Sequence, residues 1–157
     1  MDMNQKDTAK HFGLDELRAG GHIIRDERGW RKDEVEVSRC WQAVIFPSFH
    51  QAASLTTAHF SEHEFRGNVH PKEILACMVI EDNSIPIGPV SVHRDPVELL
   101  FRNINLSPKE DYAAIDGIGY NISIQLCHIK TSLMISYPFE ESHVAIEKGL
   151  FELATTI

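Results

Sequence analysis

Cysteine is scarce in this chain of 157 residues, and Cys40, Cys77 and Cys127 lie far apart with no Cys-x-x-Cys pair. That spacing argues against a disulfide framework or a zinc knuckle and favours reduced, buried thiols. Long apolar runs are also missing, since no stretch approaches the roughly 18 residues of a membrane helix. Residues 1–7 are polar and lack the apolar centre of a signal peptide. We therefore expect a cytoplasmic protein that has no membrane partner.

Basic residues are also few, with 15 lysines and arginines against 23 aspartates and glutamates and a formal net charge of −8 at pH 7. Residues 1–66 hold 11 acids and 9 bases, whereas residues 67–157 hold 12 acids and 6 bases. This charge disfavours nucleic-acid backbones as partners. It favours a basic protein surface, which an acidic chain attracts through long-range steering.

Motifs for nucleophilic or nucleotide chemistry are absent. The chain has no Gly-x-Ser-x-Gly, no P-loop and no cysteine in the setting of a catalytic nucleophile. The stretch Asp116-Gly117-Ile118-Gly119 lacks the third glycine and the following helix of a dinucleotide-binding loop. It predicts a turn that leads into a strand.

Strand patterns are the clearest positive signal. Apolar residues recur at every second position over 33–47, with an irregularity near Arg39 and Cys40 that predicts a bulge. The same alternation over 118–126 and 132–137 predicts an antiparallel hairpin. An apolar run over residues 74–80 predicts a buried strand, and two prolines restrict 85–92 to the edge of a sheet.

Helix patterns lie between and around these strands. Residues 5–19 predict a helix that Gly20 and Gly21 end, and part of 49–66 predicts a second one. Asp95-Pro96-Val97-Glu98 has the capping residues of a short third helix. A last helix carries one apolar stripe, made of Phe139, Ile146, Leu150 and Leu153.

Together these patterns predict an α+β fold in which residues 1–157 form a single domain. We expect a mainly antiparallel sheet of about five strands, with helices packed mostly on one face and a C-terminal helix among them. Trp30 follows a charged turn at residues 26–29. It is either a core anchor or an exposed contact, and for so large an aromatic residue the core is the commoner place.

One stretch resembles a metal-binding motif: Thr57-Ala58-His59-Phe60-Ser61-Glu62-His63, followed by Phe65 and Arg66-Gly67. On a helix, His59 and His63 would point the same way and could bind one zinc ion, and Glu62 could deprotonate a metal-bound water. The stretch resembles the zinc motif of inverted-motif metallopeptidases such as the mitochondrial processing and pitrilysin-type enzymes. That resemblance implies a third glutamate ligand downstream, for which Glu140 or Glu141 is suitably spaced.

A second resemblance covers the C-terminal quarter. Asp116-Gly-Ile-Gly-Tyr-Asn-Ile-Ser-Ile, then Leu-Met-Ile-Ser-Tyr, then a helix that ends in Leu-Phe-Glu-Leu-Ala resembles the end of small bacterial immunity proteins of secreted-toxin systems. The resemblance implies a protein that binds a cognate toxin, often through acidic surface. Four acids border the terminal hairpin and are our predicted partner-binding residues: Glu110, Asp111, Glu140 and Glu141.

Our leading hypothesis is therefore a non-enzymatic protein that binds and neutralises a bacterial toxin, with no cofactor. The enzyme alternative is a zinc-dependent hydrolase in which His59 and His63 bind the metal and Glu62 is the catalytic base. A third alternative is a structural subunit that self-associates, for example as a homodimer.

Overall fold

A computed structural model describes residues 5–47, 52–80, 86–98, 118–126, 129–136 and 141–157. Within these ranges the chain forms a large antiparallel sheet, a separate two-stranded hairpin and two helices, which confirms the predicted α+β class. The elements, in chain order, are α1 (Gln5–His11), β1 (Gly20–Arg25), β2 (Arg31–Pro47), β3 (Ala53–Phe60), β4 (His63–Phe65), β5 (Asn68–His70), β6 (Glu73–Ile80), β7 (Pro86–Ser91), β8 (Ile118–Leu126), β9 (Ile129–Ser136) and α3 (Glu141–Thr156).

The main sheet has the order β7-β6-β3-β2-β8-β9, and β1 pairs with β2 outside this path. Strand β2 is 17 residues long because its two halves have different partners. Its first half pairs with β1, from Gly20↔Val37 onward. Its second half pairs with β3 on one side and β8 on the other. The register shifts between Val37 and Arg39, where the predicted bulge occurs.

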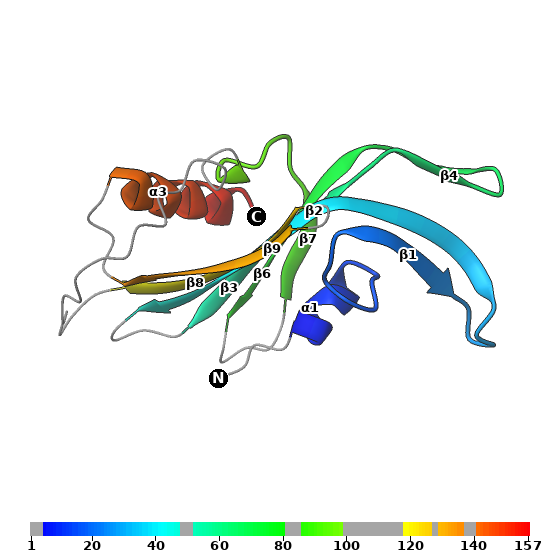
Figure 1. The fold of residues 1–157 in the computed structure, drawn as a ribbon, viewed down its shortest axis with the longest axis horizontal. Coiled ribbons are helices and arrows are strands. Elements are labelled where there is room, and N and C mark those ends of the chain that lie inside the picture. The colour runs from blue at the N-terminus through cyan, green and yellow to red at the C-terminus, as the bar shows by residue number, and fades with distance from the viewer. Residues whose placement is uncertain (1–4, 48–51, 81–85, 99–117, 127–128, 137–140) are drawn as a thin grey trace.

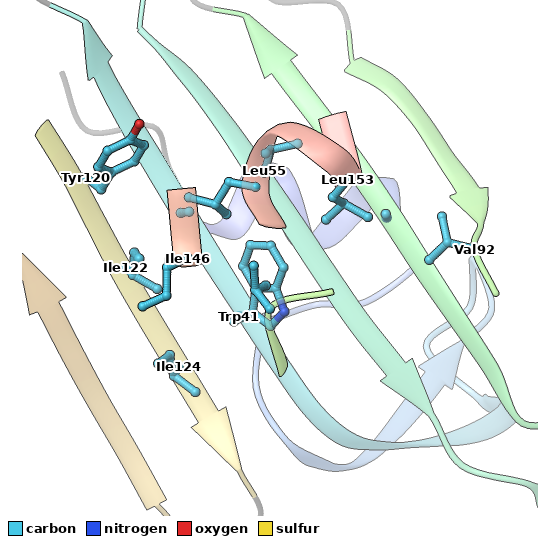
Figure 2. Packing of buried hydrophobic residues seen from close by; sticks show 12 residues of the cluster. Trp41, Leu55, Val92, Tyr120, Ile122, Ile124, Ile146 and Leu153 are labelled. Atoms are coloured by element: carbon cyan, nitrogen blue, oxygen red, sulfur yellow. The ribbon is translucent and has the colours of Figure 1, made fainter. Parts of the chain in front are cut away.

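One face of the sheet packs against α3. Side chains at alternate positions of β2, β3 and β8, such as Trp41, Leu55 and Ile122, meet the apolar stripe of α3 (Figure 2). Of the predicted stripe, Ile146, Leu150 and Leu153 are each 1% exposed, and Phe139 lies outside the described residues. This side also holds the segment after β7, where Val97 is fully buried.

The opposite face packs against α1 and the turn that follows it. Ala9, Phe12, Leu14 and Leu17 contact apolar positions of β2, β3 and β6. The side chains of Cys40 and Trp41 show the division, because these neighbours in β2 belong to different cores. Most helical residues are in α3, and the seven-residue α1 is on the other side. No helix in the described part of the chain is long and apolar enough to cross a membrane.

Two predicted helices differ in the structure. The helix predicted for residues 5–19 ends at His11, because Gly13 has a φ of 72° and the chain turns there. The prediction of helix within 49–66 is wrong, since 53–60 form β3 and 63–65 form β4. With β1 and β3 added, the main sheet has seven strands where about five were expected.

Three strand predictions are confirmed. Strands β8 and β9 form the predicted hairpin, with pairing from Leu126↔Ile129 to Gly119↔Ser136. Strand β6 fills the apolar run at residues 73–80, and β7, with its prolines, is at the edge of the sheet.

A projecting arm extends from the sheet on the side away from α3 (Figure 1). We define the arm as β1, the first half of β2 (residues 31–37) and the β4–β5 hairpin. Figure 1 shows β1 and β2 curving away together, with β4 projecting above them. Most residues of the two cores lie outside the arm, and Val37, at its base, is the arm residue buried in the core beside α1.

Candidate functional site

The two histidines of the metal-like motif lie on different strands. His59 is in β3, and His63 begins β4. Residues Phe65 and Asn68 pair across a two-residue loop in which Arg66 has a φ of 49° and Gly67 a φ of 83°. Positive φ at both loop positions is the geometry of a type I′ hairpin turn. The helical spacing that the zinc prediction needs is therefore absent.

His59 is held in a buried polar network. Its Nε2 atom lies 2.8 Å from Asp95 Oδ2, and the Trp41 indole donates to the same oxygen at 2.5 Å. The Val97 backbone N–H donates to Asp95 Oδ1 at 3.1 Å. The Asp95 side chain is fully buried and that of His59 is 4% exposed. Asp95, predicted as the cap of a helix start, thus also links β2, β3 and the segment after β7.

The other ring nitrogen of His59 is also engaged. Arg39 Nε lies 3.3 Å from His59 Nδ1, and Arg39 Nη1 contacts Glu98 Oε1 at 2.7 Å. A guanidinium can only donate, so Nδ1 must accept and the ring proton is on Nε2, where it is donated to Asp95. With both nitrogens engaged, His59 acts as a structural link and is not poised as a metal ligand or a base.

His63 and His70 join the β4–β5 hairpin to β2. His70 Nε2 lies 3.0 Å and 2.9 Å from the two carboxylate oxygens of Asp33. His63 lies between Glu34, at 3.4 Å, and Glu36, at 3.9 Å. The hydrogen bond between His70 and Asp33 therefore joins the two parts of the arm, whereas His63 faces its carboxylates without a hydrogen bond at its buried Nε2.

The other predicted site residues do not join these clusters. Glu62 is exposed in the link between β3 and β4. Glu110, Asp111 and Glu140 lie outside the described residues, and Glu141 begins α3 at a position whose side chain is not described. Within the described ranges, no three His, Cys, Asp or Glu side chains are grouped as a metal site would require.

The tip of the arm carries an exposed tryptophan that the sequence placed more readily in the core. Trp30 is 72% exposed, the highest value among the exposed large apolar side chains of the described residues. It ends the loop between β1 and β2, which we call the Trp30 turn (residues 25–31). Every residue from 25 to 32 is exposed. The charged residues on both sides of Trp30 are the feature of the sequence that could have indicated this exposure.

The Trp30 turn is fixed by its own hydrogen bonds. The Asp26 carboxylate accepts from the backbone N–H groups of Arg28 and Trp30, both at 2.9 Å. The Asp26 N–H donates to the Trp30 carbonyl and the Gly29 N–H to the Asp26 carbonyl, again at 2.9 Å. Gly29 has a φ of 81°, which glycine adopts without strain. Arg25, the first residue of the turn, donates from its guanidinium to the Gly29 carbonyl at 3.0 Å.

Aromatic and charged contacts stiffen the hairpin beside it. The guanidinium groups of Arg31 and Arg66 lie 4.7 Å and 5.0 Å from the centre of the Phe65 ring. Arg31 also pairs with Glu34 on its own strand. Such stacked cation–π contacts are favourable even near the surface. The arm is thus an ordered surface with Trp30 at its end.

The base of the arm contains a buried histidine. His22 is 4% exposed, and its Nε2 lies 2.9 Å from the Arg18 carbonyl. Burial lowers the pKa of His22 below its ordinary value of 6.5, because the charged ring would lose its hydration. His22 is therefore neutral in the folded protein near pH 7, and its Nε2–H donates to the Arg18 carbonyl.

Comparison of the chain with protein-family models, with curated proteins and with solved structures gives no match.

Proposed function

We propose that this is a non-enzymatic protein-binding protein that neutralises a bacterial toxin in the cytoplasm. The observation that supports this most is the projecting arm, which presents exposed apolar side chains on ordered strands. Ile23 is 40% exposed, Trp30 72% and Val69 65%. Exposed aromatic residues on a rigid frame are typical of protein-recognition surfaces.

The polar clusters favour binding over catalysis. A catalytic histidine must reach a substrate, whereas His59 has both nitrogens engaged and a side chain that is 4% exposed. His70 is hydrogen-bonded to Asp33 within the arm, and His63 faces Glu34 and Glu36. His59 thus links strands of the main sheet, and His70 links the two parts of the arm that carries Trp30.

Charge supports a protein partner as well. The formal net charge of −8 would attract a toxin with a basic active-site groove. Glu110, Asp111, Glu140 and Glu141 remain our proposed contacts for such a groove.

Co-expression tests the proposal. The proposal predicts that a neighbouring gene encodes the toxin: its product should arrest bacterial growth when expressed alone, and co-expression of this protein should restore growth. A catalytically inactive form of that toxin should co-purify with this protein in a 1:1 complex. An unrelated toxin from another system is the control. Growth arrest that persists, together with no complex, would refute the proposal.

Metal analysis separates this function from the zinc-hydrolase alternative. Protein purified without a histidine tag should contain zinc well below one atom per chain, because His59 and His63 have different partners. A content near one zinc per chain that His59→Ala or His63→Ala removes would favour the hydrolase.

A further inference from the structure

We propose that Trp30 is the anchor of the toxin interface, and that it enters an apolar pocket rimmed by aspartate and glutamate side chains on the partner. This inference rests on the proposed function and adds the site and the chemistry of the partner surface. It is carried by three observations: the exposure of Trp30, the order of the turn and the local charge.

The exposed indole of Trp30 is a large apolar surface that is available for binding. The indole is 72% exposed, and its N–H has no hydrogen-bond partner among the described residues. Tryptophan and arginine are the residue types most enriched among those that dominate binding energy at protein interfaces. Both the apolar ring and the free donor of Trp30 would be satisfied in a pocket that offers an acceptor at its rim.

The order of the turn lowers the cost of binding. Five hydrogen bonds fix residues 25–30, from the Asp26 carboxylate at its centre to Arg25 at its base. A loop that already has its bound shape loses little conformational entropy on association. The Trp30 turn is therefore built to present its tryptophan and has no apolar core of its own.

Charge at the tip is opposite in sign to that of the chain. Residues 25–32 hold four bases and two acids, in a chain with a formal net charge of −8. The Asp26 carboxylate and the Arg25 guanidinium both bond to backbone groups of the turn, and Arg31 is paired with Glu34, so the outward bases of the tip are Arg28 and Lys32. Arg28 and Lys32 are exposed on either side of Trp30. This surface complements an acidic rim on the partner.

The favoured partner class is a protein and not a nucleic acid. A single strand could stack a base on Trp30, but the residues outside the tip carry a formal charge of −10, since the tip holds +2 of the total of −8. Phosphate backbones that extend beyond the tip would be repelled. A protein can instead place an acidic rim at the tip and a basic groove against the acidic remainder, which also fixes its orientation.

The experiment measures binding of the inactive toxin to the full-length protein and its variants by surface plasmon resonance. Trp30→Ala should weaken the affinity by about 30-fold or more, as expected for the central aromatic residue of an interface. Phe151→Ala is the matched control, because Phe151 is an aromatic residue 51% exposed on α3, away from the arm. It should leave the affinity unchanged. Thermal unfolding of both variants should match the wild type.

Reversing the charge of the tip tests whether the rim of the partner's pocket is acidic. Arg28→Glu combined with Lys32→Glu should slow association with the toxin by about 10-fold at low salt, with a smaller change in dissociation. Faster association would show that the partner surface is basic and would overturn the acidic rim. Binding of a 20-nucleotide single strand that depends on Trp30 would overturn the choice of a protein partner.

The outcomes for the function and for this inference are distinct. If wild-type protein does not bind the toxin, the proposed function fails and the inference falls with it. If wild-type protein binds but Trp30→Ala binds equally well, the function stands and the Trp30 interface is refuted.

Discussion

His59 in β3 and Asp95 after β7 are 36 positions apart in the chain, yet His59 Nε2 lies 2.8 Å from Asp95 Oδ2 with both side chains buried. The same carboxylate accepts the Trp41 indole N–H and the Val97 backbone N–H. A buried charge is tolerated when several donors compensate it. Asp95 is therefore the residue on which this network depends.

Asp95→Ala should lower the free energy of unfolding by about 3–5 kcal/mol, because it leaves the donors of Trp41 and His59 buried and unpaired. The neighbouring Arg94→Ala is the control. Arg94 forms an ion pair with Glu152, but its side chain is 72% exposed, so its loss should cost about 0–1 kcal/mol. Urea denaturation gives both values. Equal effects of the two substitutions would show that the network is not a stabilising centre.

Gly149→Ala should destabilise the packing of α3. A Cβ at this position would collide with Cγ1 of Val97, a residue that is fully buried. Alanine gains about 1 kcal/mol over glycine in a helix, but overpacking a core costs about 1–3 kcal/mol. We expect a net loss of about 1 kcal/mol by thermal or urea unfolding.

Gly21→Ala is the matched control for that substitution. A Cβ at Gly21 has no atom within 4 Å, and the residue has no positive φ. It should be neutral or slightly stabilising, since alanine restricts the unfolded chain. A neutral Gly149→Ala would mean that α3 can shift away from Val97 without cost.

The sequence predicts a strand most clearly where one face of that strand is exposed to solvent and the other is buried. Strand β8 alternates because Tyr120, Ile122 and Ile124 are buried against α3, and it was predicted correctly. Strand β3 does not alternate, since positions 54 to 59 are all buried. Its polar Thr56 faces the buried Gln42 at 3.2 Å. The stretch therefore mixes residues that favour helix with residues that favour strand, and helix was predicted for part of it. When both faces of a strand are buried, its sequence loses the alternation of apolar and polar residues on which the prediction depends.

The site was less predictable, for a related reason. His59 is close to Glu62 and His63 in the sequence, but its partner Asp95 follows β7, and Trp41, which donates to the same carboxylate, is in β2. The pairing of β3 with β2 and β6, and of β6 with β7, brings those residues together. Trp30 could have been recognised as exposed, because six charged residues surround it within residues 25–32.

Lowering the pH should reduce the free energy of unfolding through protonation of the buried His22. Burial lowers the pKa of folded His22, whereas the unfolded chain retains the ordinary value of 6.5. The unfolded state therefore binds the proton first, so the contribution of His22 is complete above pH 6.5 and is lost as the pH falls from there toward the folded pKa. One proton gives a slope of at most about 1.4 kcal/mol per pH unit.

The measurement compares the free energy of unfolding at pH 7.5 and pH 5.5 for the wild type and His22→Gln. Glutamine keeps a donor for the Arg18 carbonyl but cannot titrate. The variant should lose less stability than the wild type over this interval. His93→Gln, at an exposed position, is the control and should follow the wild type. Identical pH profiles for wild type and His22→Gln would contradict the prediction.

The thiol of Cys77 should resist alkylation in the folded protein. Cys77 is 1% exposed in the core beneath α1, and burial raises its pKa to about 11. At pH 8 that pKa leaves about 0.1% thiolate, against roughly a quarter for a free cysteine of pKa about 8.5, so labelling should be at least about 100-fold slower than in urea. Peptide mass spectrometry after iodoacetamide treatment measures the rate at Cys77 itself. Equal rates in native buffer and in urea would mean that the α1 side of the sheet opens readily, because only exposure to water would restore the ordinary thiolate fraction.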